Sequence, residues 1–185
     1  LIGHKGHQEL IGTSGYVNQG LLHIVETDKD VEKLTLDPSK PMGFLTQTTL
    51  STDDTQVIIS KLRKRYPDIK GPPKADICYA TTNRQNSVKE IASKCDVVIV
   101  CGSPDSSNSN RLRETAELLG VDSYIIDTVA ELDEEWLKGR VNCGVTSGAS
   151  VPQIIVNQLL NKLKEMFPNA VLHESENIEK DIHFP

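Results

Sequence analysis

One pattern recurs along this chain: a short run of β-branched residues, then a polar turn rich in Ser, Thr and Asn, then an amphipathic helical pattern. It is clearest over residues 42–67, 75–94, 96–120 and 141–167, and a shorter version, "SYIIDTVAEL", covers residues 123–132. Strands that alternate with helices favour parallel sheets, because the helix carries the chain back to the start of the next strand. The pattern therefore predicts an α/β fold of repeated small parallel-sheet βα units.

A linker is predicted at "YPDIKGPPK", residues 66–74, because its prolines and glycine cannot continue a helix. It divides the chain into two predicted units, residues 1–73 and residues 74–185. The tail from residue 169 onward is ambiguous and is compatible with one edge strand. The chain begins with "LIG", which reads as the end of a strand already under way. We therefore expect a piece of a longer protein, with the first unit truncated at its start.

Composition excludes several classes of function. The net charge of −6 and the 4% of aromatic residues argue against a nucleic-acid binder. No apolar run approaches the roughly 20 residues that span a bilayer, so no membrane partner is expected. The four cysteines form no CxxC pair, and Cys95, Cys101 and Cys143 lie in or beside apolar runs. A reducing, cytoplasmic compartment is the simplest interpretation.

The polar turns are the candidate ligand site. In parallel α/β sheets, ligands bind beyond the carboxyl ends of the strands, where helix N-termini favour anions. Five such turns are present: "GHKGHQE", "TQTTLS", "CYATTN", "GSPDSSNSN" and "GVTSGAS". A helix needs one N-cap, yet residues 106–109 supply four capping side chains in succession. Neither GxxxxGK[ST] nor GxGxxG occurs, so the turns predict a phosphoester held by neutral donors rather than a nucleotide fold.

Two of these turns carry further chemistry. The spacing of His4 and His7 is compatible with zinc, but no group of partner ligands completes such a site. His7 and Glu9 can instead supply a phosphate donor and a proton-transferring carboxyl group. Cys78 stands at a predicted strand end before "YATTNR", so it is either a packed thiol or a metal ligand. The basic residues 61–74 read as a solvated helix end, with docking of an acidic electron carrier as the alternative.

Taken together, "GHKGHQE", "TQTTLSTDDT", "DICYATTNRQ", "SSNSNRL" and "GVTSGAS" resemble the IspH/LytB family of 4-hydroxy-3-methylbut-2-enyl diphosphate reductases. The resemblance runs in order from residue 1 to about residue 152. It implies three α/β units around a central cavity, of which this chain supplies the second and third. It also implies a [4Fe-4S] cluster on three cysteines, of which Cys78 is one, with the other two upstream of this chain.

The resemblance further implies reductive removal of an allylic hydroxyl to give isopentenyl and dimethylallyl diphosphate. Glu9 would be the proton source and Thr48 would orient the hydroxyl. The implied diphosphate-binding residues are His7, Thr81, Ser106, Ser107, Asn108 and Ser150. Electrons would come from ferredoxin or flavodoxin, in the cytoplasm or in a plastid stroma.

Two residues depart from the family pattern. Asp105 replaces an expected neutral amide beside the Ser-Ser-Asn run, where a carboxylate near a diphosphate repels it unless it points away. Gln8 replaces a common proline between His7 and Glu9, which is expected to loosen Glu9. A phosphosugar- or diphosphate-binding module without redox chemistry is the alternative function, and we expect the isolated chain to be inactive because the site is incomplete.

Overall fold

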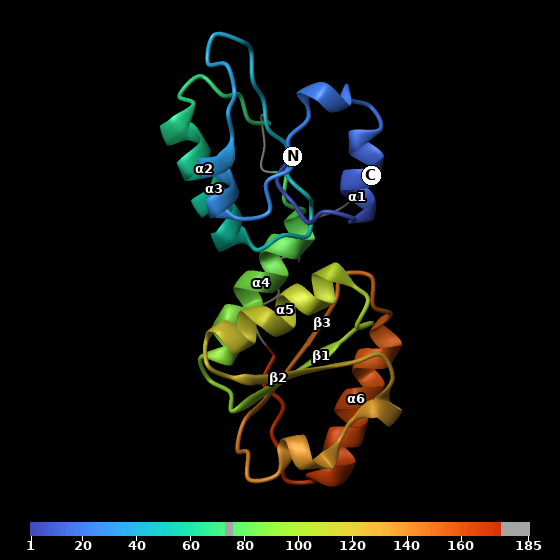
Figure 1. The fold of residues 1–185 in the computed structure, drawn as a ribbon. Helices are drawn as coiled ribbons and strands as arrows, with labels where there is room; N and C mark the ends of the chain where they lie inside the picture. The colour runs from blue at the N-terminus through green and yellow to red at the C-terminus, as the bar shows by residue number, and fades with distance from the viewer. Residues whose placement is uncertain (73–75, 175–185) are drawn as a thin grey trace. The chain divides into compact units, whose positions relative to one another are not determined.

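The computed structural model describes residues 1–72 and 76–174, which divide into two compact units, Leu1–Gln85 and Asn86–Pro185 (Figure 1). The unit boundary predicted between residues 73 and 74 lies outside the described residues and stays a prediction. Most of the predicted C-terminal edge strand lies outside them too, and residues 169–174 form no strand. Within the described ranges, no helix is long and apolar enough to cross a membrane.

The first unit contains short helices joined by brief parallel pairings. Its elements are α1 (Gln8–Ser14), η1 (Gln19–Leu21), α2 (Asp28–Lys33), α3 (Thr52–Arg65) and the first turns of α4 (Tyr79–Ala92). Ile2 pairs in parallel with both Val25 and Thr46, and Gly43 pairs with Lys70. Residues 43–46, at the start of the repeat predicted over residues 42–67, are thus bridged on both sides. Each pairing is one residue long, so in the described part of this unit the strands are reduced to isolated bridges.

A single apolar cluster holds the first unit together. Ile2 lies at its centre with 1% of its surface exposed, and α3 contributes Ile58 and Leu62 from one helical face. The other buried members are Val25, Val31, Leu34, Phe44, Leu50 and Tyr66. This cluster fixes the segments on which the polar turns of residues 4–9 and 46–51 stand.

The second unit is the predicted α/β arrangement. β1 (Val97–Cys101) lies between β2 (Asp122–Ile126) and β3 (Cys143–Ser147), and both pairings are parallel. β1 is buried on both faces, as its unbroken apolar sequence predicts for a central parallel strand. Figure 1 shows α5 (Ser107–Leu118) and α6 (Gln153–Met166) on opposite faces of this sheet. Two short helices, η2 (Val129–Glu131) and η3 (Glu134–Leu137), connect β2 to β3.

The alternation of side chains along β1 explains the two layers. Val98 and Val100 point to the α5 side, where they meet Leu112 and Ala116. Val97, Ile99 and Cys101 join the opposite cluster with Leu159 of α6. Because the strand period is two, one five-residue strand serves both cores.

The parallel sheet brings two polar turns together at its carboxyl edge. Cys101 and Ser147 are in register at the ends of β1 and β3, and the N–H of Gly148 donates to the carbonyl of Cys101 at 2.9 Å. The turns that follow, residues 102–106 and 148–152, are therefore neighbours. One leads into α5 and the other into α6, whose N-cap is Pro152.

Candidate functional site

Glu9 is held by Thr48, a residue 39 positions away. One carboxylate oxygen of Glu9 accepts from the Thr48 backbone N–H at 2.8 Å, and the other accepts from the Thr48 hydroxyl at 2.7 Å. Glu9 lies in the first turn of α1, whose N-cap is His7, and the His7 Nδ1 accepts from the Glu9 N–H at 3.3 Å. Two of the predicted site residues thus share a two-point contact that orients the carboxyl group.

Thr48 also connects this pair to Cys78. The backbone N–H of Cys78 donates to the Thr48 carbonyl at 2.9 Å, and the Cys78 carbonyl accepts from Thr82 at 2.9 Å as α4 begins. Cys78 is an exposed, free thiol at the N-terminus of that helix. Glu9, Thr48 and Cys78, which were predicted separately as proton source, orienting residue and metal ligand, are therefore neighbours along one hydrogen-bonded path.

Two buried glutamines, which the sequence analysis did not single out, fix the loops around this path. Gln47 has 1% of its surface exposed, and its side-chain oxygen accepts from the His4 N–H at 3.0 Å. Gln85, equally buried, accepts from the Thr52 N–H at 3.1 Å and donates to the Leu50 carbonyl at 2.8 Å. A buried amide that pairs with loop backbone has no periodic signature, so only the fold reveals these residues.

The structure places the remaining predicted residues of the first unit as follows. His7 is half-buried at the N-cap of α1, and Thr81 is buried in the first turn of α4. His4 is exposed. In the ranges that the structure describes, no group of three or more His, Cys, Asp and Glu side chains could hold a metal ion.

The start of α5 carries the predicted diphosphate-binding run. Ser106 is the N-cap, and its hydroxyl accepts from the Ser109 N–H at 3.3 Å, while Ser107 is the first helical residue. Asn108 has only 9% of its surface exposed, yet neither polar atom of its side chain has a hydrogen-bond partner. Ser150 is exposed on the neighbouring turn after β3. A buried amide without a partner at a helix N-terminus is suited to receive an anionic oxygen.

The two departures from the family pattern are accommodated locally. Asp105 is exposed, and its backbone N–H donates to the Ser103 hydroxyl at 3.2 Å. Repulsion of an anion by a solvated carboxylate is weakened by the high dielectric constant of water. Gln8 is the first residue of α1 and is exposed, and Glu9 is held by Thr48 despite the missing proline.

Cys95 and Cys101 differ from Cys78, whereas Cys143 is exposed as Cys78 is. Cys101 is fully buried in β1, and burial raises the pKa of its thiol to about 11. Burial also raises the pKa of Cys95. A thiol that resists ionisation is a poor metal ligand, so these residues are packed hydrophobes, as their apolar surroundings predict.

Three basic residues of the run at residues 61–74 make contacts within the first unit. Lys61 pairs with Asp28 at 2.6 Å and with Glu32 at 3.3 Å. Arg65 donates to the carbonyls of Glu32 and Leu34, and Arg63 lies over the ring of Phe44. These contacts support a structural role for the three residues, namely fastening α3 to the rest of its unit.

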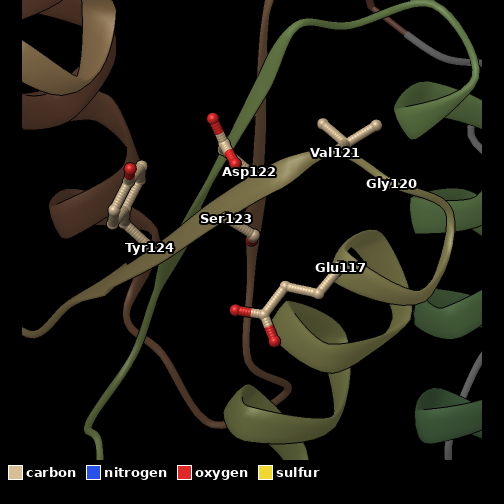
Figure 2. A pocket seen from close by; sticks show the side chains of 6 residues that line it. All are labelled: Glu117, Gly120, Val121, Asp122, Ser123 and Tyr124. Carbon is tan, nitrogen blue, oxygen red and sulfur yellow. The ribbon is translucent and has the colours of Figure 1, made fainter.

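A hollow of about 310 Å³ lies at the start of β2 (Figure 2). It is lined by Glu117, Gly120, Val121, Asp122, Ser123 and Tyr124, none of which is a predicted site residue. It adjoins the amino end of β2, whereas the polar turns follow the carboxyl ends of β1 and β3. Its two carboxylates are paired with Arg113 and Arg140, and no predicted phosphate-binding residue lines it, so we do not assign the phosphate to this hollow.

Comparisons with known proteins show the family to which the chain is related. The family model described as LytB protein matches residues 1–164. The 4-hydroxy-3-methylbut-2-enyl diphosphate reductase of Psychrobacter sp. is 49% identical over the whole chain, and that of Marinobacter nauticus is 51% identical over 90% of it. The chain spans 58% and 54% of their respective lengths. The solved E-1-hydroxy-2-methyl-but-2-enyl-4-diphosphate reductase of Plasmodium falciparum matches 97% of this chain with a TM-score of 0.88 and 39% identity, and the match covers 57% of that protein.

Proposed function

Because the chain belongs to the LytB protein family, we propose that it works as part of a 4-hydroxy-3-methylbut-2-enyl diphosphate reductase of isoprenoid biosynthesis. The reaction takes two electrons and two protons, breaks the allylic C–O bond and releases water. Its products are isopentenyl and dimethylallyl diphosphate. The observation that carries the proposal is the path from Glu9 through Thr48 to Cys78, because it joins an acid to a thiol ligand at one place.

Glu9 is the proposed proton donor. Hydroxide is a poor leaving group, and a positioned carboxylic acid lets the oxygen leave as water. The two contacts with Thr48 fix the orientation of the carboxyl group, so that its proton is directed rather than free to rotate away. The Thr48 hydroxyl, which lies 2.7 Å from Glu9, is the proposed contact for the substrate hydroxyl.

Cys78 fits the cluster that the family implies. Iron–sulfur clusters are held by cysteine thiolates, and Cys78 offers an exposed, unpaired thiol at a helix N-terminus. We propose that it ligates a [4Fe-4S] cluster and that the two other cysteines come from the part of the relatives' length that this chain does not span. When bound, such a cluster supplies electrons and a Lewis-acidic iron for the substrate hydroxyl.

The diphosphate is the proposed ligand of the α5 N-terminus. The proposed contacts are Ser106, Ser107 and Asn108 of the helix and Ser150 of the next turn. The family resemblance also implies His7 and Thr81, which stay proposed diphosphate-binding residues. The unpartnered amide of Asn108 is the strongest support, since a charged oxygen satisfies it. Neutral donors contribute roughly 1.5–3 kcal/mol for each bond to a charged group, so several together hold a diphosphate without a lysine.

Ferredoxin or flavodoxin is the proposed electron donor. The described cysteines are unpaired, which supports a reducing compartment, and we propose the cytoplasm or a plastid stroma. The basic residues of α3 give no specific support to donor docking there, because Lys61 and Arg65 already have partners within the unit.

The test is a pair of cysteine variants in the full-length protein, purified without oxygen. Cys78→Ser is expected to lose the visible absorption of the cluster and all turnover of the allylic diphosphate. Cys143→Ser, a thiol at the amino end of β3, is the matched control and is expected to keep both. A colourless wild-type protein with full activity would refute the proposal. Tight binding of a hexose phosphate but not of inorganic diphosphate would favour a phosphosugar-binding module instead.

A further inference from the structure

Ser109 fills a space that two glycines leave open. Its side chain is fully buried in the first turn of α5. A Cβ atom built on Gly102 or on Gly148 would overlap the Ser109 side-chain oxygen. Gly102 directly follows β1 and Gly148 directly follows β3. The Ser109 hydroxyl therefore occupies the volume of both missing methyl groups, and α5 approaches the two strand ends as closely as the glycines allow.

The contact joins the two walls of the proposed diphosphate site. Asn108 immediately precedes Ser109, and its side-chain nitrogen lies 3.6 Å from the position that a Gly148 Cβ would take. Ser150 lies two residues beyond Gly148. The Ser109 hydroxyl itself has no hydrogen-bond partner, so its fit between the glycines rests on volume and not on a bond.

We infer that Gly148 is a positioning residue: because it has no side chain, Ser109 packs against it and the α5 N-terminus comes close to the turn after β3. The inference rests on the proposed function, because the spacing matters for a ligand held by both walls. Gly148 acts through its neighbours: its contact with Ser109 brings the Asn108 amide and the Ser150 turn to the separation that one diphosphate needs. Widening this spacing weakens every bond across the site at once.

The two glycines differ in a way that gives a sharp test. A Gly148 Cβ meets the Ser109 oxygen, and the next atoms are 3.4 Å or more away. A Gly102 Cβ also meets the Ser109 Cβ at 2.8 Å, and Gly102 has a φ of +155°, which side chains rarely adopt. Removing the Ser109 hydroxyl should therefore make room for alanine at position 148 but not at position 102.

The experiment measures binding of inorganic diphosphate by calorimetry, and kcat and KM for the allylic diphosphate, in the full-length, cluster-loaded protein. Gly148→Ala is expected to weaken diphosphate binding and raise KM by about tenfold, with the cluster absorption unchanged. Ser109→Ala alone is expected to bind within about threefold of wild type, and Ser109→Ala/Gly148→Ala to recover that level. Gly102→Ala, the matched control, is expected to stay impaired when combined with Ser109→Ala.

Wild-type affinity in Gly148→Ala, or no recovery in the double variant, would overturn the inference. So would weakened binding in Ser109→Ala that Ser109→Thr restores, because that result assigns the hydroxyl a direct contact with the ligand. If Gly148→Ala fails to fold, the double variant still decides, since it is expected to fold and bind. A wild-type protein that neither binds diphosphate nor turns over would refute the proposed function, while the unfolding temperatures of the same variants would still report the fit of Ser109.

Discussion

Replacing Glu9 by glutamine removes the acidic proton of the side chain while keeping its hydrogen bonds to Thr48. The amide oxygen of the new side chain can accept from the Thr48 N–H, and the amide nitrogen can donate to the Thr48 hydroxyl, so both contacts at 2.8 and 2.7 Å survive. The side chain keeps its length and its place in the first turn of α1. Only the transferable proton is lost.

The two effects change different quantities. A hydrogen bond to a charged group contributes about 1.5–3 kcal/mol and a neutral one about 0.5–1.5, so two weakened contacts lower the free energy of unfolding by about 2–3 kcal/mol, which leaves kcat of the folded enzyme unchanged. Loss of a positioned general acid lowers kcat by about 10²–10⁴, which is roughly 3–5 kcal/mol of barrier. The activity loss should therefore exceed what local destabilisation explains.

The assay compares kcat, diphosphate affinity and unfolding temperature in the full-length, cluster-loaded enzyme. Glu9→Gln is expected to lose kcat while binding inorganic diphosphate within about threefold of wild type. Glu26→Gln is the matched control: Glu26 also accepts a backbone N–H, from Lys5 at 2.8 Å, and its variant should keep kcat. Thr48→Val loses one contact with Glu9 but keeps the backbone one, so a smaller kcat loss, about tenfold to a hundredfold, is expected. A kcat above one third of wild type in Glu9→Gln would refute the acid role.

Two further predictions concern stability. Gln8→Pro should raise the free energy of unfolding by about 0.4–1 kcal/mol in a denaturant titration. Gln8 is the first residue of α1, and His7 before it has the extended φ and ψ (−66°, 139°) that a following proline needs. A loss of stability would show that Gln8 is not at a proline-compatible position. The Asp96 carboxylate accepts from the N–H groups of Asn142 and Val141, which hold its pKa below the usual range. The stabilisation of the folded chain by the Asp96 carboxylate is therefore present above pH ~4 and is lost as the pH falls through the lowered pKa. The difference in unfolding temperature between wild type and Asp96→Asn should narrow below pH ~4 in thermal melts. A difference that does not change with pH would contradict this assignment.

The second unit was predictable from local pattern because the five residues of β1 indicate a buried strand by their composition alone. "VVIVC" is apolar throughout and mostly β-branched, which is typical of a strand covered on both faces, and the structure puts Val98 and Ile99 in opposite cores. In the structure the helix that follows begins after its N-cap Ser106 and ends just before Gly120, which adopts a φ of +81°.

The first unit was less predictable. Strands were expected before the polar turn of residues 46–51 and up to Cys78, yet Gly43 and Thr46 form only single parallel bridges, and residues 76–78 form none. A side chain pairs with backbone where a longer strand would have a backbone partner: the Asp76 carboxylate accepts from the Thr46 N–H at 2.8 Å. Strand pairing is decided by partners distant in sequence, so local propensity cannot set its length.

By itself, the sequence determined the chemical inventory: which turns are polar, which cysteine stands outside an apolar run, and that the phosphate donors are mostly neutral. It also determined the alternation of strand and helix, because side-chain periodicity is local. Only the tertiary structure decided that Thr48 contacts both Glu9 and Cys78, and that Ser109 fits between Gly102 and Gly148. Those contacts join residues up to 39 positions apart in the chain, and such separations are closed by packing of the whole unit rather than by any local preference.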